Sequence, residues 1–174
     1  PLRRQRQMCI RDRDIDAAVG KGEFVVFYDG EKVKTSRAVN SFTTTVQGKG
    51  DSYKKCKIVD CMDLIADDLT TAIQDNYLGK YANSYDNKCV LIAAIKMYFK
   101  QLSIDGIVSN DFSVDFDIEA IKVYLIGKGK YTEEELAAMD DTAIAKLDTG
   151  SRVFIKANVT ILDAMEDVDL PIEI

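Results

Sequence analysis

Hydrophobic periodicity changes between a strand-like and a helix-like pattern along this chain, and the order of these changes restricts the fold more than any other feature. Residues 23–28 are rich in β-branched and aromatic side chains, and apolar residues alternate with polar ones over residues 31–39. Two long central segments instead repeat apolar residues at three- and four-residue steps, and alternation returns near the end. Alternation is typical of half-buried strands and the longer steps of amphipathic helices. Strands at both ends that enclose central helices favour an α+β fold.

The two N-terminal segments are predicted to form a β-hairpin. Asp29 and Gly30 separate them, and Asp-Gly between two such runs is a strong hairpin signal because a type I′ turn needs positive φ at both central positions. We therefore expect a two-residue turn there. Residues 43–52 are polar and contain glycine, so they are expected to form a loop.

Two long central segments are predicted to be amphipathic helices. The first covers about residues 55–76 and is followed by Gly79, which suits a left-handed cap. The second follows a polar loop at residues 80–87 and ends before Gly106. The short loop predicts that the two helices are antiparallel neighbours.

Strand-like and helix-like patterns alternate after the second helix. Residues 112–116 predict a short strand, because their aromatic and β-branched side chains alternate with polar ones. Residues 117–127 have helix-like spacing, with a strand as the alternative. Thr132 and Glu135 form a capping box that predicts the start of a short helix.

Two alternating segments complete the chain. Residues 152–162 alternate strictly, residues 163–167 break the pattern, and residues 168–174 alternate again. We expect a mixed sheet, built from the N-terminal hairpin and these C-terminal strands, that packs against the two antiparallel helices.

Charge is distributed unevenly along the chain. The net charge is −6, but residues 1–13 carry five Arg and one Asp, a net +4, which leaves −10 for the rest. Residues 1–13 resemble translated read-through of a sequencing adaptor, so we expect a non-native or disordered leader, with a flexible basic arm as the alternative. An acidic body would repel a phosphate backbone, so no nucleic-acid partner is expected. The longest apolar run is six residues, so no membrane insertion is expected.

The sequence offers no motif for catalysis or metal binding. It contains no His, which excludes a Ser-His-Asp triad and His-ligated zinc. Cys56 and Cys61 match no zinc spacing. Gly-Lys-Gly occurs three times without the rest of a phosphate-binding loop. Asp60, Asp63 and Asp67 share one side of a helix, which favours a solvated acidic face. We expect no enzyme activity, no cofactor and no metal.

The C-terminal segment allows two interpretations. Its alternating apolar residues are Val168, Leu170, Ile172 and Ile174. Pro171 has no N–H and suits an edge strand. The segment either folds back beside residues 152–162 or joins the sheet of a neighbouring copy by strand addition. Spacing alone favours the first.

Three short motifs resemble one known family. Residues 37–41 read Arg-Ala-Val-Asn-Ser, residues 77–80 read Tyr-Leu-Gly-Lys with Asn83 close behind, and residues 161–166 read Ile-Leu-Asp-Ala-Met-Glu. Their order and spacing are similar to those of the C-terminal domain of contractile phage tail sheath proteins, in the prophage and Gram-positive branch. The resemblance covers about residues 22–174 and assigns residues 14–174 to that domain. Family members are much longer, so it also implies an N-terminally truncated chain.

The resemblance implies a structural protein. Sheath subunits stack as hexameric rings around a tail tube and contract to drive the tube through the target envelope. The implied partners are other copies of the chain and the tail tube protein, and the implied location is the virion tail, after assembly in the host cytoplasm. Extended arms that add strands to neighbouring sheets link the subunits.

The resemblance also changes the interpretation of the C-terminal segment. Residues 168–174 become the candidate link between subunits. The candidate hinge before this link consists of Asp163, Ala164, Met165, Glu166 and Asp167.

A second hypothesis is a small α+β adaptor that binds a protein partner through its acidic surface. Such an adaptor would stay small, whereas sheath subunits would form rings or tubes. A third hypothesis, a hydrolase that uses Asp pairs, would require activity that depends on a divalent metal.

Overall fold

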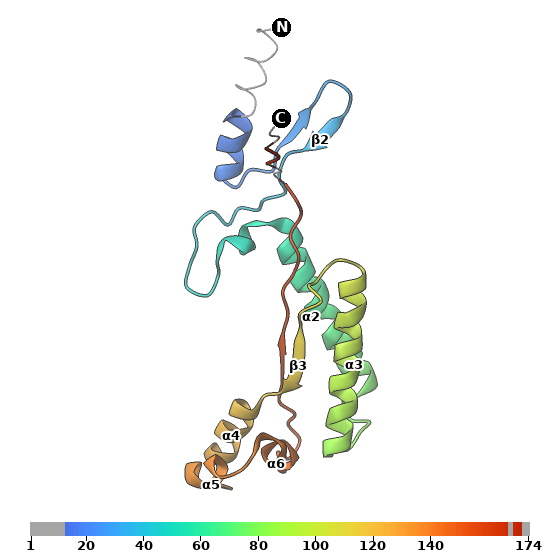
Figure 1. Cartoon of the computed structure of the whole chain (residues 1–174), viewed down its shortest axis with the longest axis vertical. Coiled ribbons are helices and arrows are strands. Elements are labelled where there is room, and N and C mark those ends of the chain that lie inside the picture. Colours follow the sequence, from blue (N-terminus) through green and yellow to red (C-terminus); the bar gives the residue numbers. More distant parts are fainter. Residues whose placement is uncertain (1–12, 167–168, 172–174) are drawn as a thin grey trace. The chain divides into compact units, whose positions relative to one another are not determined.

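The computed structural model describes residues 13–166 and 169–171. It divides into two compact units, and the division falls within one long helix. Unit 1 holds the described residues up to Ile65 and those from Asp163 onward, and unit 2 runs from Ala66 to Leu162. Each unit is described by itself below, with the element labels of Figure 1.

Unit 1 contains a short helical stretch at residues 13–20 and a β-hairpin. Strand β1 (Val26–Tyr28) pairs antiparallel with β2 (Val33–Thr35). The hairpin is confirmed, but the two-residue turn is wrong, because Tyr28 pairs with Val33 and leaves four residues in the loop. The Asp29 carboxylate accepts hydrogen bonds from the backbone N–H groups of Glu31 and Lys32, both at 2.9 Å. This side-chain turn takes the place of a type I′ turn.

A second pairing in unit 1 joins the chain after the hairpin to the start of the long helix. Val39 forms an antiparallel bridge with Lys55, which lies between the 3-10 helix η1 (Asp51–Lys54) and helix α2 (Cys56–Asn76). The Asn40 side chain donates to Tyr53 O at 2.8 Å and accepts from the N–H of Phe42 at 2.9 Å. Asn40 thus fixes both sides of this junction.

Unit 2 contains the C-terminal part of α2 and helix α3 (Tyr85–Ile104). Both helices were predicted, and both end before a glycine with positive φ, Gly79 at 73° and Gly106 at 71°. The helices run in opposite directions, and Tyr98 Oη of α3 donates to Asp68 Oδ2 of α2 at 2.8 Å. Burial and the Asp68 carboxylate together raise the pKa of Tyr98.

The sheet of unit 2 consists of β3 (Ser113–Phe116) and β4 (Ile155–Asn158), which pair antiparallel. Val114 faces Ala157 and Phe116 faces Ile155 across the two strands. The side of the sheet that carries these residues packs on α3, where Val114 is fully buried and Phe99 lies 5.9 Å from Phe112 between ring centroids. Figure 1 shows α3 running beside β3.

Three helices follow β3 and close a small core. They are α4 (Ile118–Gly127), α5 (Glu133–Ala137) and α6 (Asp141–Lys146). Residues 117–127 are therefore a helix, capped by Asp117, and the strand alternative is wrong. The Thr132–Glu135 capping box is confirmed. The core consists of Ile121, Leu125, Leu136 and Ile144, each at most 1% exposed.

The fold class is α+β, as predicted, but the expected single sheet is wrong. Among the described residues the structure has two separate two-stranded sheets, β1–β2 and β3–β4. Alternation identifies a strand and its buried face but not the strand with which it pairs. The pattern alone therefore could not show that the hairpin and β4 belong to different sheets. β4 instead takes β3, the strand that lies closer to it in sequence.

Candidate functional site

The loop between α2 and α3 is tied to the start of β4 by one side chain. Asn83 Nδ2 donates to Gly150 O at 2.6 Å, to Arg152 O at 3.1 Å and to Thr149 Oγ1 at 3.3 Å. Thr149 is 1% exposed. Asn83 belongs to the second sequence motif, and these hydrogen bonds give it a structural role: it connects the loop between α2 and α3 to the segment before β4.

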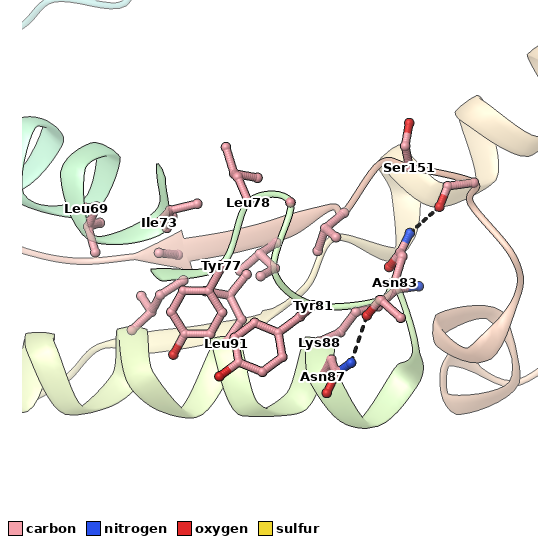
Figure 2. A pocket seen from close by; sticks show the side chains of 17 residues that line it. Leu69, Ile73, Tyr77, Leu78, Tyr81, Asn83, Asn87, Lys88, Leu91 and Ser151 are labelled. Atoms are coloured by element: carbon pink, nitrogen blue, oxygen red, sulfur yellow. Dashed lines mark hydrogen bonds between the residues drawn. The ribbon is translucent and has the colours of Figure 1, made fainter. Parts of the chain in front are cut away.

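This tie borders an open, largely apolar hollow of about 830 Å³ in unit 2. Figure 2 shows the side chains that line it, which come from α2, from α3, from the loop between them and from the β4 segment. The aliphatic lining residues are Leu69, Ile73, Leu78, Ala82, Leu91, Ile95, Val153, Ile155 and Ala157. Tyr77 and Tyr81 complete the wall, with ring centroids 5.6 Å apart.

Several lining side chains of the hollow are left in contact with solvent. Leu78 is 62% exposed, Tyr81 59% and Val153 41%. Single exposed apolar residues are common on protein surfaces, but a contiguous group around a hollow is typical of an interaction site. The hollow is therefore the strongest candidate binding surface in the described residues of unit 2.

The strand beside the hollow is paired on one side only. Beyond β4, the antiparallel pairing continues through Ser109 N–H to Thr160 O at 2.8 Å and Leu162 N–H to Ile107 O at 2.8 Å. All of these bonds lead toward the β3 segment, and the sheet contains just two strands within the part of the chain that is described. The other edge of β4 therefore presents N–H and C=O groups to which a further strand could bind.

Polar side chains also line the hollow, and two of them, Lys88 and Asn83, are buried at a polar atom or nearly so. Lys88 of α3 is 5% exposed, and burial lowers the pKa of its ammonium while Asp148 opposes that shift. Asn83 Oδ1 is buried and has no hydrogen-bond partner among the described residues. Both residues line the hollow. The sequence did not indicate that these residues line a hollow, because a single lysine on an otherwise apolar helical face forms no recognisable motif.

The described part of the candidate hinge lies in unit 1, where two basic side chains hold its carboxylates. The Lys55 ammonium pairs with Asp163 and, at 3.2 Å, with Glu166 Oε2. Arg37 Nε lies 4.0 Å from the same Glu166 oxygen. Arg37 belongs to the first sequence motif and Asp163 and Glu166 to the third. We name Arg37, Lys55, Asp163 and Glu166 the ionic clasp.

The ionic clasp shifts the titration of its members. Hydrogen bonding to Lys55 holds the pKa of Asp163 below its ordinary value of 3.8. The same contact, reinforced by Glu166, raises the pKa of Lys55 above 10.5, although burial opposes this. Met165, between the two carboxylates, is 93% exposed. The clasp thus fixes the ends of the segment 163–166 and leaves its middle free.

The candidate linking residues can be placed only in part. Leu170 is 76% exposed, and residues 169–171 form no strand. Asp167, Val168, Ile172 and Ile174 lie outside the described residues. The strand and hinge assignments thus stay predictions.

The described residues contain no group of three or more His, Cys, Asp or Glu side chains that could hold a metal ion. No helix within the described ranges is long and apolar enough to span a membrane. Asp60, Asp63 and Asp67 are exposed along α2. The predicted solvated acidic face therefore describes them correctly.

Comparison with known proteins identifies the family. Residues 48–174 match the phage tail sheath C-terminal domain. The chain is also 35% identical over 158 residues to the tail sheath protein of Clostridium phage phiCD119, which covers 91% of this chain and 43% of that protein. The chain thus spans less than half the length of this curated relative. From these matches, the chain belongs to the phage tail sheath family and carries the C-terminal domain of that family.

Proposed function

We propose that this chain is a structural subunit of a contractile tail sheath and not an enzyme. In this proposal its copies polymerise into hexameric rings around a tail tube, and contraction of the rings drives the tube through the target envelope. Its partners are other copies of the chain and the tail tube protein. It works in the virion tail after assembly in the host cytoplasm. Family membership supports the structural role.

The observation that carries the proposal is the unfinished sheet of unit 2. A two-stranded sheet is marginal in water, and stable sheets have three or more strands or a covering element. Here β3 is covered by α3, whereas one edge of β4, beside the apolar hollow, is paired with no strand among the described residues. A strand from another copy would satisfy that edge and cover the exposed lining at the same time.

The segment proposed to do this is residues 168–174 of a neighbouring copy. Its apolar residues alternate, so one side of an added strand could face the hollow while its backbone pairs with β4. Pro171 would lie in this strand without an N–H, which suits an edge strand that pairs on one side only. The added strand would then end the sheet and not extend it further.

The hinge assignment completes the proposed link. The ionic clasp holds residues 163–166 at the root of the segment, while Leu170 is exposed. We propose that the clasp marks the fixed end and that the following residues carry the strand to the neighbouring copy. Rigid domains connected by such strands could move relative to one another without losing contact.

The decisive experiment removes the segment from a full-length relative, such as the sheath protein of phage phiCD119. Deletion of the residues that correspond to 168–174 should abolish the tubes seen by electron microscopy and leave the circular dichroism spectrum unchanged. Two point variants at the positions that correspond to Leu170 and Asp169 test the side chains without a change in length: an aspartate at the first position should reduce tube formation strongly, whereas an asparagine at the second should not. Normal tubes after deletion would refute the linking role.

A further inference from the structure

The β-hairpin of unit 1 (Figure 1) presents an apolar face to solvent. Residues directly opposite each other in an antiparallel pair lie on the same face. Val26 is opposite Thr35 and Tyr28 is opposite Val33, so these four residues share one face. Its three large apolar side chains are 55% to 70% exposed, and Phe24, just before β1, is 58% exposed. We name Val26, Tyr28 and Val33 the hairpin face.

The strand β1 is apolar on both of its sides. Residues 24–28 read Phe-Val-Val-Phe-Tyr, and Val25 and Phe27, which alternate with the exposed residues, are half-buried. A strand that packs on one side has polar residues on the other, whereas a continuous apolar run is typical of a strand covered on both sides. The sequence of β1 therefore indicates a second layer over the hairpin face, which the described residues leave exposed.

The hairpin is also small for a sheet that stands alone. Within the described ranges β1 and β2 pair only with each other, and an isolated two-stranded hairpin is marginal in water. The hairpin face carries no charged residue, because Lys34 lies opposite Phe27 and belongs to the other side. Contacts that form once and persist are more apolar than transient ones. The face thus suits a permanent apolar cover.

The extent of the matches to known proteins indicates what the cover is. The hairpin precedes residues 48–174, which match the C-terminal domain of the family. The match to the sheath protein of phage phiCD119 covers 91% of this chain but 43% of that protein. More than half of that relative therefore lies outside the match, which is enough polypeptide to supply the second layer.

We infer that the hairpin is the margin of a larger domain of a full-length sheath protein, in which the part of the same polypeptide outside the match covers the hairpin face. This contact forms when one subunit folds and needs no second copy. The inference rests on family membership and is separate from the proposed strand exchange, because that link uses β4 of unit 2 and the hairpin belongs to unit 1.

The test compares cysteine labelling in the 174-residue chain and in the full-length sheath protein of phage phiCD119. The chain carries Val33→Cys, the relative carries a cysteine at the corresponding position, and peptide mass spectrometry follows the reaction of that thiol with a maleimide. The chain should react rapidly, because Val33 is 70% exposed. Unassembled subunits of the relative should react at least about tenfold more slowly, because a buried thiol is inert.

The matched control is a cysteine at the position of Glu31, which lies in the exposed hairpin loop. This thiol should react rapidly in both proteins. Hydrogen exchange gives the same comparison without a substitution: backbone amides of the residues that correspond to β1 should exchange slowly in unassembled subunits of the relative and rapidly in the 174-residue chain.

The assembly state separates the possible covers. Slow labelling at the Val33 position in unassembled subunits as well as in tubes supports a cover from the same polypeptide. Rapid labelling in unassembled subunits with slow labelling in tubes would overturn the inference and assign the hairpin face to a neighbouring copy. Rapid labelling in both states would also overturn it, because the face would then stay exposed. The deletion of residues 168–174 tests strand exchange independently of all these results.

Discussion

Two parts of unit 2 use the same apolar residue types with opposite results. Between α4, α5 and α6, the side chains of Ile121, Leu125, Leu136 and Ile144 are at most 1% exposed. Around the hollow, by contrast, Leu78 and Val153 are 62% and 41% exposed. The first group is enclosed by the three short helices together with neighbours such as Phe116 and Phe154, whereas the second group is left partly exposed. The sequence shows which residues are apolar, but only the folded structure shows which of them stay exposed and can contact another molecule.

The largest expected effect compares one leucine from each part. Leu125→Ala removes a fully buried side chain and should lower the free energy of unfolding by about 3 kcal/mol, from lost transfer energy and a cavity. Leu78→Ala removes an exposed side chain and should change it by less than about 0.5 kcal/mol. Urea denaturation followed by circular dichroism measures both. Equal losses would mean that the hollow is already packed in the free chain.

A smaller effect is expected where the hollow meets the rest of unit 2. Asn83→Ala removes the tie to Thr149, Gly150 and Arg152 and should cost about 1–2 kcal/mol in the same assay. Asn87→Ala is a suitable control, because Asn87 donates a single side-chain hydrogen bond, to Ala82 O at 2.8 Å. A loss for Asn83→Ala no greater than for this control would show that the tie is unimportant.

The smallest effect is expected at the ionic clasp of unit 1, where the side chains of Asp163 and Lys55 are 42% and 29% exposed. The pKa of Asp163 is lowered on folding, so its contribution is complete above its ordinary pKa of 3.8 and is lost as pH falls through the lowered value. The raised pKa of Lys55 adds stability that is complete below 10.5 and lost as pH rises through the raised value. The contribution therefore persists across neutral pH.

The measurement for the clasp compares thermal unfolding of the unchanged chain and Asp163→Asn. The difference should be under about 1 kcal/mol at pH 7, should shrink in high salt, and should vanish once the pH has fallen through the lowered pKa of Asp163. A difference that is the same at pH 2 and pH 7 would contradict the pairing.

Local signals in the sequence predicted the helices well. Gly79, Gly106 and the Thr132–Glu135 capping box each specify a helix end through their own backbone or side-chain chemistry. These helix-end signals depend only on residues close together in the sequence, so the sequence alone is enough to predict where each helix begins or ends. The predicted hairpin turn was wrong for a related reason. The Asp29 carboxylate binds the backbone N–H groups of Glu31 and Lys32, and the Asp-Gly pattern alone does not distinguish this turn from a type I′ turn.

Distant partners could not be predicted in the same way. Alternation in residues 152–162 correctly indicated an extended segment, but it could not show that β3 is the partner of β4, or that β4 pairs on only one edge within the described ranges. The Lys55–Asp163 pair joins residues more than 100 positions apart. No residue near either of them in the sequence indicates that they form an ion pair. The burial of Lys88 was missed because residues that line the hollow with it, such as Val153 and Ile155, lie more than 60 positions away in the chain.

The ionic clasp also has a mechanical consequence. If tension is applied to the C-terminal segment, the load falls on the ion pairs of Lys55 with Asp163 and Glu166. These are side-chain contacts and not backbone hydrogen bonds between strands. Contacts between partly hydrated charges exchange readily with water. Under such tension the ion pairs of the clasp could therefore break and re-form without any change in the backbone pairing of β1 and β2.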